Sequence, residues 1–438
     1  MKNFGLKGLL GFFIFLFCAS PLVDYDSIRK TAAEGNFESA YGALDSSMER
    51  YGEKNLALYH LDKGLLSHYA KMTGNSRQHF FRAEDLMEEY SVMSVSREAA
   101  SVVTNENVKE YAGMDYERAL SYFFNAANFL SEGDLEGAQV EGRRGRLIIK
   151  ELQSRYSGKA RYKDEVLLRA LNGLMHEVSG EYDDAYISYY RYFKVCREQN
   201  ETLNMSIMKR LIYLAKRQER SDDLLEILGY YPEGKNFDVE ERLVSALVFA
   251  GYAGRGPALT QKKFSGSFAD SRGHTHHLTF AVPEFLEQPS SADGFGLTLR
   301  KDNGMEIFAS SAEQIRNINR VSKENLKDRM PSIIRKTATR VLAKTIANEK
   351  IKNKIYGGNP VLNLIKGIVV DSFFEALEQT DTRICNLLPG RVFLTVIPVN
   401  EGDYVFSVRA SDGSLNESHA VNVNKNQKLY YVSNAALW

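Results

Sequence analysis

A short phrase that begins with glycine and ends with alanine recurs through the first half of the chain. Three copies start at Gly35, Gly133 and Gly180 and end at Ala40, Ala138 and Ala185, and a variant runs from Gly113 to Ala119. Glycine adopts the left-handed helix C-cap at least cost, and the acidic residues that follow it suit the positive end of the next helix. The recurrence therefore predicts pairs of helices joined by tight turns, with each alanine where two helices approach closely.

The stretch from residue 170 to 193 shows the repeat unit best. Gly173 lies seven residues before Gly180, and Tyr189 lies four residues after Ala185. This spacing resembles the tetratricopeptide helix-turn-helix repeat, although the copies do not keep its period of about 34 residues. We predict a short tetratricopeptide-like solenoid over residues 25–253, with a concave face as its binding surface.

A change in pattern near residue 251 marks a domain boundary. Beyond it, alternating apolar and polar residues predict a β-rich domain over residues 258–438, arranged as a small sandwich. The hairpin signal Asp302-Asn303-Gly304 joins two of the predicted strands. These strands cover residues 277–282, 296–301, 306–309, 391–399, 404–410, 420–423 and 429–432. The predicted fold class is thus multidomain α + β, with a helical insertion at about 312–378 inside the β-rich domain.

The first part of the predicted insertion is strongly basic. Residues 316–354 contain 12 Lys or Arg and three acids, a net charge of +9, and Arg335, Lys336, Arg340 and Lys344 lie near its centre. A basic helix of this kind binds an anionic membrane or an acidic partner, or simply solvates one face of a helix packed on the domain. All three interpretations stay open.

The N-terminus has the pattern of an export signal. Lys2 and Lys7 precede an apolar run that ends at Cys18, and we assign residues 1–22 to a signal peptide or membrane anchor. Cys18 is a candidate for lipidation, although Phe17 replaces the small residue that lipoprotein signals carry before their cysteine. The alternatives are an uncleaved anchor and a cytosolic protein with a buried N-terminal helix. We expect an exported, periplasm-facing protein held at a membrane.

No pattern in the chain predicts catalysis, a cofactor or a metal. Lys and Arg balance Asp and Glu at 56 each, so nucleic acid is not an expected partner. The one histidine cluster, His274, His276 and His277, lacks further ligands at metal spacing. Cys196 and Cys385 lie far apart in sequence, and we expect two buried side chains rather than a disulfide framework.

Two further segments resemble a family of uncharacterised bacterial cell-envelope lipoproteins with tetratricopeptide-like repeats. The first covers residues 96–109 and 111–118, and the second contains Asp381, Arg383, the Leu-Pro pair at 388–389 and residues 402–404. Family members often carry Trp where this chain has Cys385. The resemblance implies an envelope location and a non-catalytic role.

Polar residues in these two segments are candidates for structural bonds or partner contacts. We expect Asp381 and Arg383 to brace the junction between the helical and β-rich parts. Side chains on a long connection between helices can also bond to its backbone, and the candidates there are Arg97, Glu98, Asn105 and Asn107.

The sequence as a whole favours a non-catalytic scaffold or assembly factor of the cell envelope. Its partner is a protein or peptide held on the concave repeat face, with a membrane surface as a second candidate. The alternative function is a regulator of cell-wall or surface-polysaccharide machinery that docks on membrane through the basic helix. An envelope hydrolase or transferase is a third hypothesis.

Overall fold

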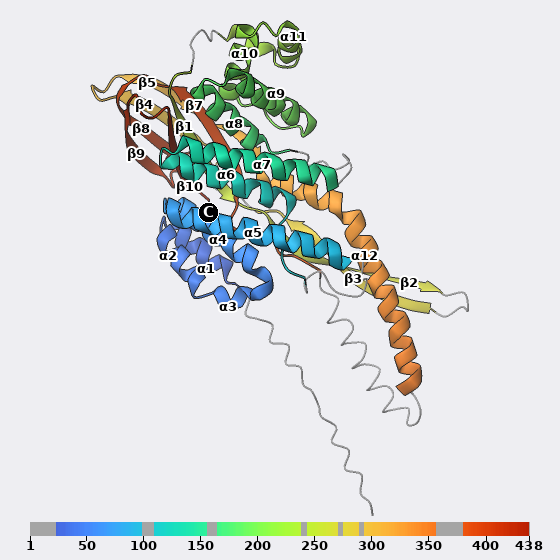
Figure 1. Cartoon of the computed structure of the whole chain (residues 1–438). Helices are drawn as coiled ribbons and strands as arrows, with labels where there is room; N and C mark the ends of the chain where they lie inside the picture. The colour runs from blue at the N-terminus through green and yellow to red at the C-terminus, as the bar shows by residue number, and fades with distance from the viewer. Residues whose placement is uncertain are drawn as a thin grey trace, which may run out of the picture.

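Helices fill the first half of the chain and strands most of the second half (Figure 1). The computed structural model describes residues 23–98, 109–155, 164–237, 243–269, 275–288, 293–355 and 380–437. The mixed α and β composition, with helices first and strands later, is what the sequence predicts. The predicted signal at 1–22, with Cys18, lies outside the described residues.

The helical half is built from consecutive antiparallel pairs. Helix α4 packs on α5, α6 on α7, α8 on α9 and α10 on α11, and each pair packs on the next. The helices are α1 (Tyr25–Ala33), α2 (Phe37–Asp45), α3 (Met48–Tyr51), α4 (Leu56–Tyr69), α5 (Thr73–Glu98), α6 (Asp115–Ser131), α7 (Leu135–Arg155), α8 (Val166–Ser179), α9 (Tyr182–Glu198), α10 (Met205–Arg217) and α11 (Ser221–Tyr230), with 3-10 turns η1 (Glu53–Asn55) and η3 (Pro232–Asn236).

The recurring glycines lie at helix boundaries. Gly35, Gly133 and Gly180 each follow the end of a helix with positive φ, and Gly113 has positive φ just before α6. A positive φ costs glycine little, so these residues reverse the chain without strain. The partner alanines are fully buried at helix contacts, and they are Ala40, Ala119, Ala138 and Ala185.

The strands form three sheets. Sheet A has the order β10-β1-β7-β6, sheet B is the β2-β3 hairpin, and sheet C has the order β5-β4-β8-β9. The strands are β1 (Ala246–Arg255), β2 (Ala258–Ala269), β3 (Thr275–Leu286), β4 (Phe295–Lys301), β5 (Glu306–Ser311), β6 (Glu313–Asn317), β7 (Pro389–Pro398), β8 (Gly402–Ala410), β9 (Asn416–Val423) and β10 (Leu429–Ala436).

Sheet A is the middle of three layers. Its strand β1 pairs parallel with β10 and antiparallel with β7. Ala246, Val248 and Tyr252 belong to the core shared with the helices, whereas Leu247 and Phe249 belong to the core shared with sheet C. Because strand side chains alternate between faces, β1 buries both. The layers are therefore helices, sheet A and sheet C (Figure 1).

The first helix of each of the four pairs contacts sheet A. Helices α4 and α6 contact β10, α8 contacts β6, and α10 contacts β7. In α6 every residue except Phe129 and Ser131 is buried. The face that these four helices turn toward the strands is therefore covered by the chain's own sheet.

Three strands lie where the sequence analysis did not place them. Strand β1 begins at Ala246, inside the range predicted to be helical repeats, because a strand buried on both faces is apolar throughout and lacks alternation. Strand β2 directly follows it. Strand β6 occupies the start of the predicted insertion, so the helix α12 (Ile318–Ile355) begins at Ile318 rather than near 312. The predicted second part of the insertion, residues 361–377, lies outside the described residues.

Candidate functional site

The segment that carries Asp381 and Arg383 joins the β-rich part to the helices. The guanidinium of Arg383 donates through Nε and Nη2 to the carboxylate of Asp381, at 2.8 and 2.7 Å. Its Nη1 donates to Asn55 Oδ1 and to the carbonyl of Lys109, both at 2.9 Å. One ion pair thus fixes the segment before β7 to the start of α4 and to the approach to α6.

Two buried carboxyl groups hold Cys385 in the same segment. Glu117 of α6 accepts hydrogen bonds from Cys385 N at 2.7 Å and from Tyr111 Oη at 2.5 Å. Asp62 of α4 accepts from Cys385 Sγ at 3.1 Å. Burial raises the pKa of Glu117, and it raises the pKa of the Cys385 thiol well above its ordinary value. A thiol kept protonated in this way is a poor nucleophile.

Asp62 also ties the first helix to the cluster. Its carboxyl accepts from Tyr25 Oη of α1 at 2.6 Å and from Tyr51 Oη of α3 at 2.7 Å. Burial, the largest cause, raises the pKa of Asp62 to about 6, although the three hydrogen bonds lower it. The cluster therefore joins α1, α3, α4, α6 and the segment before β7 through hydrogen-bonded polar groups.

The two segments singled out in the sequence meet at a cavity of about 120 Å³. Tyr111 and Met114 come from the first segment, and Asp381 and Arg383 from the second, with Arg329 of α12 opposite. Arg97 and Glu98 end α5, and their side chains, like Asn105 and Asn107, lie outside what the structure describes. The sequence predicted the Asp381–Arg383 pair but not the bonds of Asp62 and Glu117 to Cys385, which is hundreds of residues away from both.

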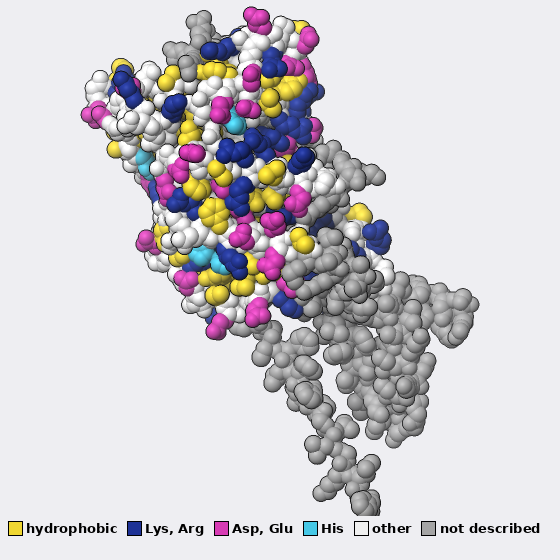
Figure 2. Space-filling model, viewed as in Figure 1, with side chains coloured by type: hydrophobic (Ala, Val, Ile, Leu, Met, Phe, Trp, Pro, Cys, Tyr) yellow, Lys and Arg dark blue, Asp and Glu magenta, His cyan; other side chains and the backbone are white. Residues whose placement is uncertain are grey.

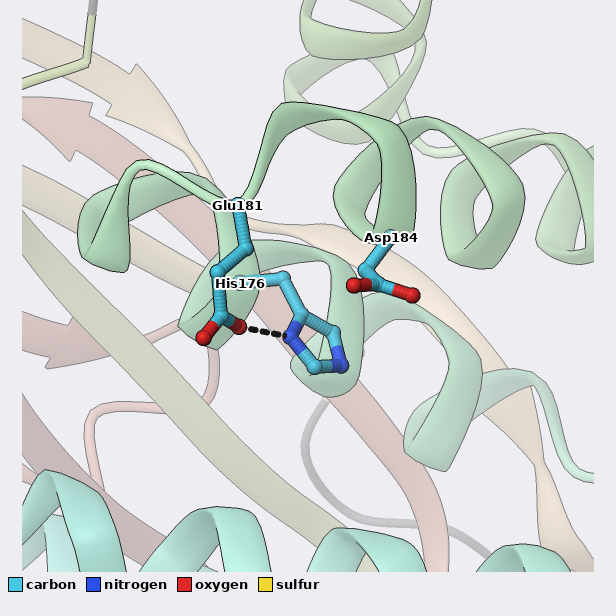
Figure 3. A group of neighbouring side chains, drawn as sticks. All are labelled: His176, Glu181 and Asp184. Carbon is cyan, nitrogen blue, oxygen red and sulfur yellow. Dashed lines mark hydrogen bonds and ion pairs between the residues drawn. The ribbon is translucent and has the colours of Figure 1, made fainter.

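A second group joins α8 to α9. Atoms of His176, Glu181 and Asp184 that can bind a metal lie within 4.8 Å of one another, and His176 Nδ1 lies 2.5 Å from Glu181 Oε2 (Figure 3). The imidazole lies between the two acids, but Arg146 Nη1 approaches its other nitrogen at 3.3 Å. A guanidinium there repels a cation, so this geometry suits a hydrogen-bonded helix turn better than a metal site. The sequence analysis did not single out this group.

The basic residues proposed on α12 do not share one exposed face. Arg335 and Lys336 are exposed, whereas Arg340 is buried at 4% exposure. The side chain of Lys344 lies outside the described residues. Apolar residues are spread around the helix rather than along one side, and Ile334 is 42% exposed. This arrangement lacks the continuous apolar face that lies in a membrane interface.

The remaining sequence candidates give simple outcomes. Cys196 and Cys385 are both buried free thiols. His274 and the side chains of His276 and His277 lie outside the described residues. Among the helices that the structure describes, none combines the length and apolar character needed to cross a membrane.

One groove in the described part lies between the α1–α2 turn, the start of β9 and the end of β10. Its volume is about 590 Å³. Glu417 there accepts from Asn434 Nδ2 at 2.7 Å and approaches Lys71 Nζ at 3.5 Å. Lys71, Glu417 and Asn434 thus bind one another in this groove.

The outer helices present a different surface. Dark blue Lys and Arg side chains gather over α7 to α9 (Figure 2). Large apolar side chains lie exposed among them, with Val140 at 41%, Leu147 at 68% and Ile187 at 59%. Basic and exposed apolar side chains therefore both lie on the outer surface of α7 and α9.

No known protein family and no curated protein matches the chain. The resemblance to envelope lipoproteins therefore stays a prediction that rests on the motifs named above.

Proposed function

We propose that this chain is a non-catalytic scaffold or assembly factor of the cell envelope that binds a protein or peptide partner. In this proposal the helical half is a tetratricopeptide-like solenoid, and sheets A and C form a sandwich fused to it. The successive helix pairs and the buried alanines at their contacts support the solenoid. The core that sheets A and C share supports the sandwich.

The contact of α4, α6, α8 and α10 with sheet A argues against a partner on these inner helices. In a tetratricopeptide-like array the first helix of each pair lines the concave face, and here those helices are buried under the chain's own strands. We therefore place the partner on the outer helices instead. Their exposed apolar side chains, Val140, Leu147 and Ile187, are the observation that carries this assignment.

Photo-crosslinking in the native cell tests the proposal. A benzophenone amino acid replaces Leu147 on α7 in one variant and Val405 on β8 in a control, because both side chains are exposed, at 68% and 40%. We expect a discrete adduct with one protein from position 147 and none from position 405. Absence of an adduct from every exposed position on α5, α7 and α9 contradicts the scaffold function.

The envelope location needs its own test. Mass spectrometry of the mature N-terminus from a membrane fraction is expected to show an acylated Cys18 or a retained apolar anchor. A soluble chain that begins at an intact Met1 contradicts export.

A further inference from the structure

We infer that the solvent face of α7 docks an acidic amphipathic helix of the partner. This inference rests on the proposed scaffold function and adds the chemistry of the partner. It concerns residues Val140, Arg143, Arg146, Leu147 and Lys150, named here the α7 strip.

The α7 strip has a helical order. Val140, Arg143, Leu147 and Lys150 follow one another at intervals of three, four and three residues, so they lie along one side of the helix. All four are exposed, and Val140 and Leu147 are separated by one heptad. A second helix that lies along this line meets apolar and basic side chains in turn.

The charge of the strip selects an acidic partner. Within the part of the chain that the structure describes, neither Arg143 nor Lys150 forms an ion pair. Glu151, at the edge of the strip, lies 3.7 Å from Arg118. The cations of the strip alternate with the apolar residues along the same line, so a partner helix that carries carboxylates beside its apolar residues complements both.

Arg146 adds a half-buried cation beside the strip. Its Nη1 contacts the ring of His176, and the charge of Asp184 acts on it favourably. Burial and the like charges of Arg169 and Arg143 lower the pKa of Arg146. A carboxylate brought by the partner offsets this repulsion.

Ion pairs order the two helices that follow α7. Asp164, which is fully buried, accepts from Arg169 Nε at 2.9 Å and from Arg191 Nε at 2.9 Å. These bonds fix α8 to α9 next to α7. A pre-ordered surface loses less side-chain entropy on binding, which suits a docking site.

Peptide titration tests the inference. The probe is a fluorescent helical peptide of about 20 residues with Leu at heptad a and d positions and Glu beside them. Matched peptides carry Gln or Lys in place of Glu, and fluorescence anisotropy gives each Kd with the full chain. We expect the Glu peptide to bind at least about tenfold more tightly than the Gln peptide, to weaken with salt, and the Lys peptide not to bind.

Charge reversal assigns the binding to the strip. The double substitution Arg143→Glu with Lys150→Glu is expected to weaken the Glu peptide at least about tenfold and to improve the Lys peptide. The control Lys425→Glu with Lys428→Glu makes the same charge change in the exposed turn after β9 and should leave both peptides unchanged. Leu147→Ser is expected to weaken the Glu peptide about fivefold at unchanged folding.

Three results overturn the inference: equal affinity for the Glu and Gln peptides, no binding up to about 1 mM, or equal effects of the strip and control variants. The crosslinking experiment separates this failure from failure of the scaffold function. An adduct that persists in the Arg143→Glu, Lys150→Glu variant contradicts the acidic helix but still supports the scaffold function. If the chain without these charge reversals gives no adduct at any position, both the acidic helix and the scaffold function are contradicted.

Discussion

A buried arginine links the strands to the helices. Arg316 of β6 is fully buried and donates to Glu165 at 3.2 Å, to Glu201 at 2.8 Å and to Gln199 at 2.7 Å. Glu165 caps α8, and Gln199 and Glu201 lie between α9 and α10. A single guanidinium thus joins sheet A to two successive helix pairs.

Replacing Arg316 with Ala should cost about 3–5 kcal/mol of unfolding free energy, because the buried carboxylate of Glu165 loses this cation and Glu201 keeps only its pair with Arg320. Urea denaturation measures this loss. The control Arg300→Ala breaks an exposed pair with Glu306 and should cost less than about 1 kcal/mol. Equal losses for the two variants would show that the buried network is not needed for stability.

Asp62 should make stability fall as pH rises. Its pKa is about 6 in the folded chain and about 3.9 when unfolded, so the folded state binds its proton more tightly. The stabilisation is complete below about pH 4 and is lost as pH rises through 6, with a slope of about 1.4 kcal/mol per pH unit. Glu117 shifts in the same direction.

The difference between the wild type and Asp62→Asn isolates this effect, since Glu117 remains in both. The wild type should lose stability relative to Asp62→Asn as pH rises from 4 to 7, so the difference between the two denaturation midpoints should change with pH. If the denaturation midpoints of the two proteins change with pH in parallel, the assignment of this proton to Asp62 is contradicted.

At the scale of elements, Gly173 sets the distance between α8 and α9. A β-carbon placed on Gly173 lies 2.4 Å from the ring of Tyr189, whereas one on Gly42 of α2 meets nothing within 4 Å. Gly173→Ala should therefore destabilise the chain by about 1–3 kcal/mol through overpacking. Gly42→Ala should stabilise it by up to about 1 kcal/mol, because alanine favours a helix. Opposite signs are expected in chemical denaturation, and a stabilised Gly173→Ala protein would contradict the packing.

The elements that the sequence predicted are those with a local signal. The Gly-to-Ala phrases mark the turns before α2, α7 and α9, and the Asp302-Asn303-Gly304 signal lies between β4 and β5 as expected. Strand β1 was not predicted because it is buried on both faces and therefore lacks the alternation of apolar and polar residues. Strand β6 was not predicted because it has only five residues and directly precedes a long helix, so its sequence pattern is weak.

The junction cluster was only partly predictable, for a similar reason. Asp381 and Arg383 carry opposite charges and lie two residues apart, so their ion pair can be predicted from the local sequence. The bonds of Cys385 to Glu117 and Asp62 span 268 and 323 residues, and no local pattern encodes such distances. The α7 strip could be read from its spacing only once the burial of α7 showed which side faces solvent.

For the molecule as a whole, the helices and sheet A share one hydrophobic core. Buried residues of α4, α6, α8 and α10 belong to the same cluster as Val248, Tyr252 and Leu394. His68 of α4 bonds to Tyr252 of β1, with 3.0 Å between Nε2 and Oη. The core therefore runs across the boundary placed between residues 253 and 258 from sequence, and the inner helices are closed by the chain's own strands.

Differential scanning calorimetry of the purified chain tests this central claim most directly. One shared core predicts a single transition whose calorimetric and van't Hoff enthalpies agree, because neither the helices nor sheet A keeps its buried surface without the other. Two separate transitions, one lost on deletion of the strands and the other unchanged, would show that the helical array stands alone with its inner face open to a partner.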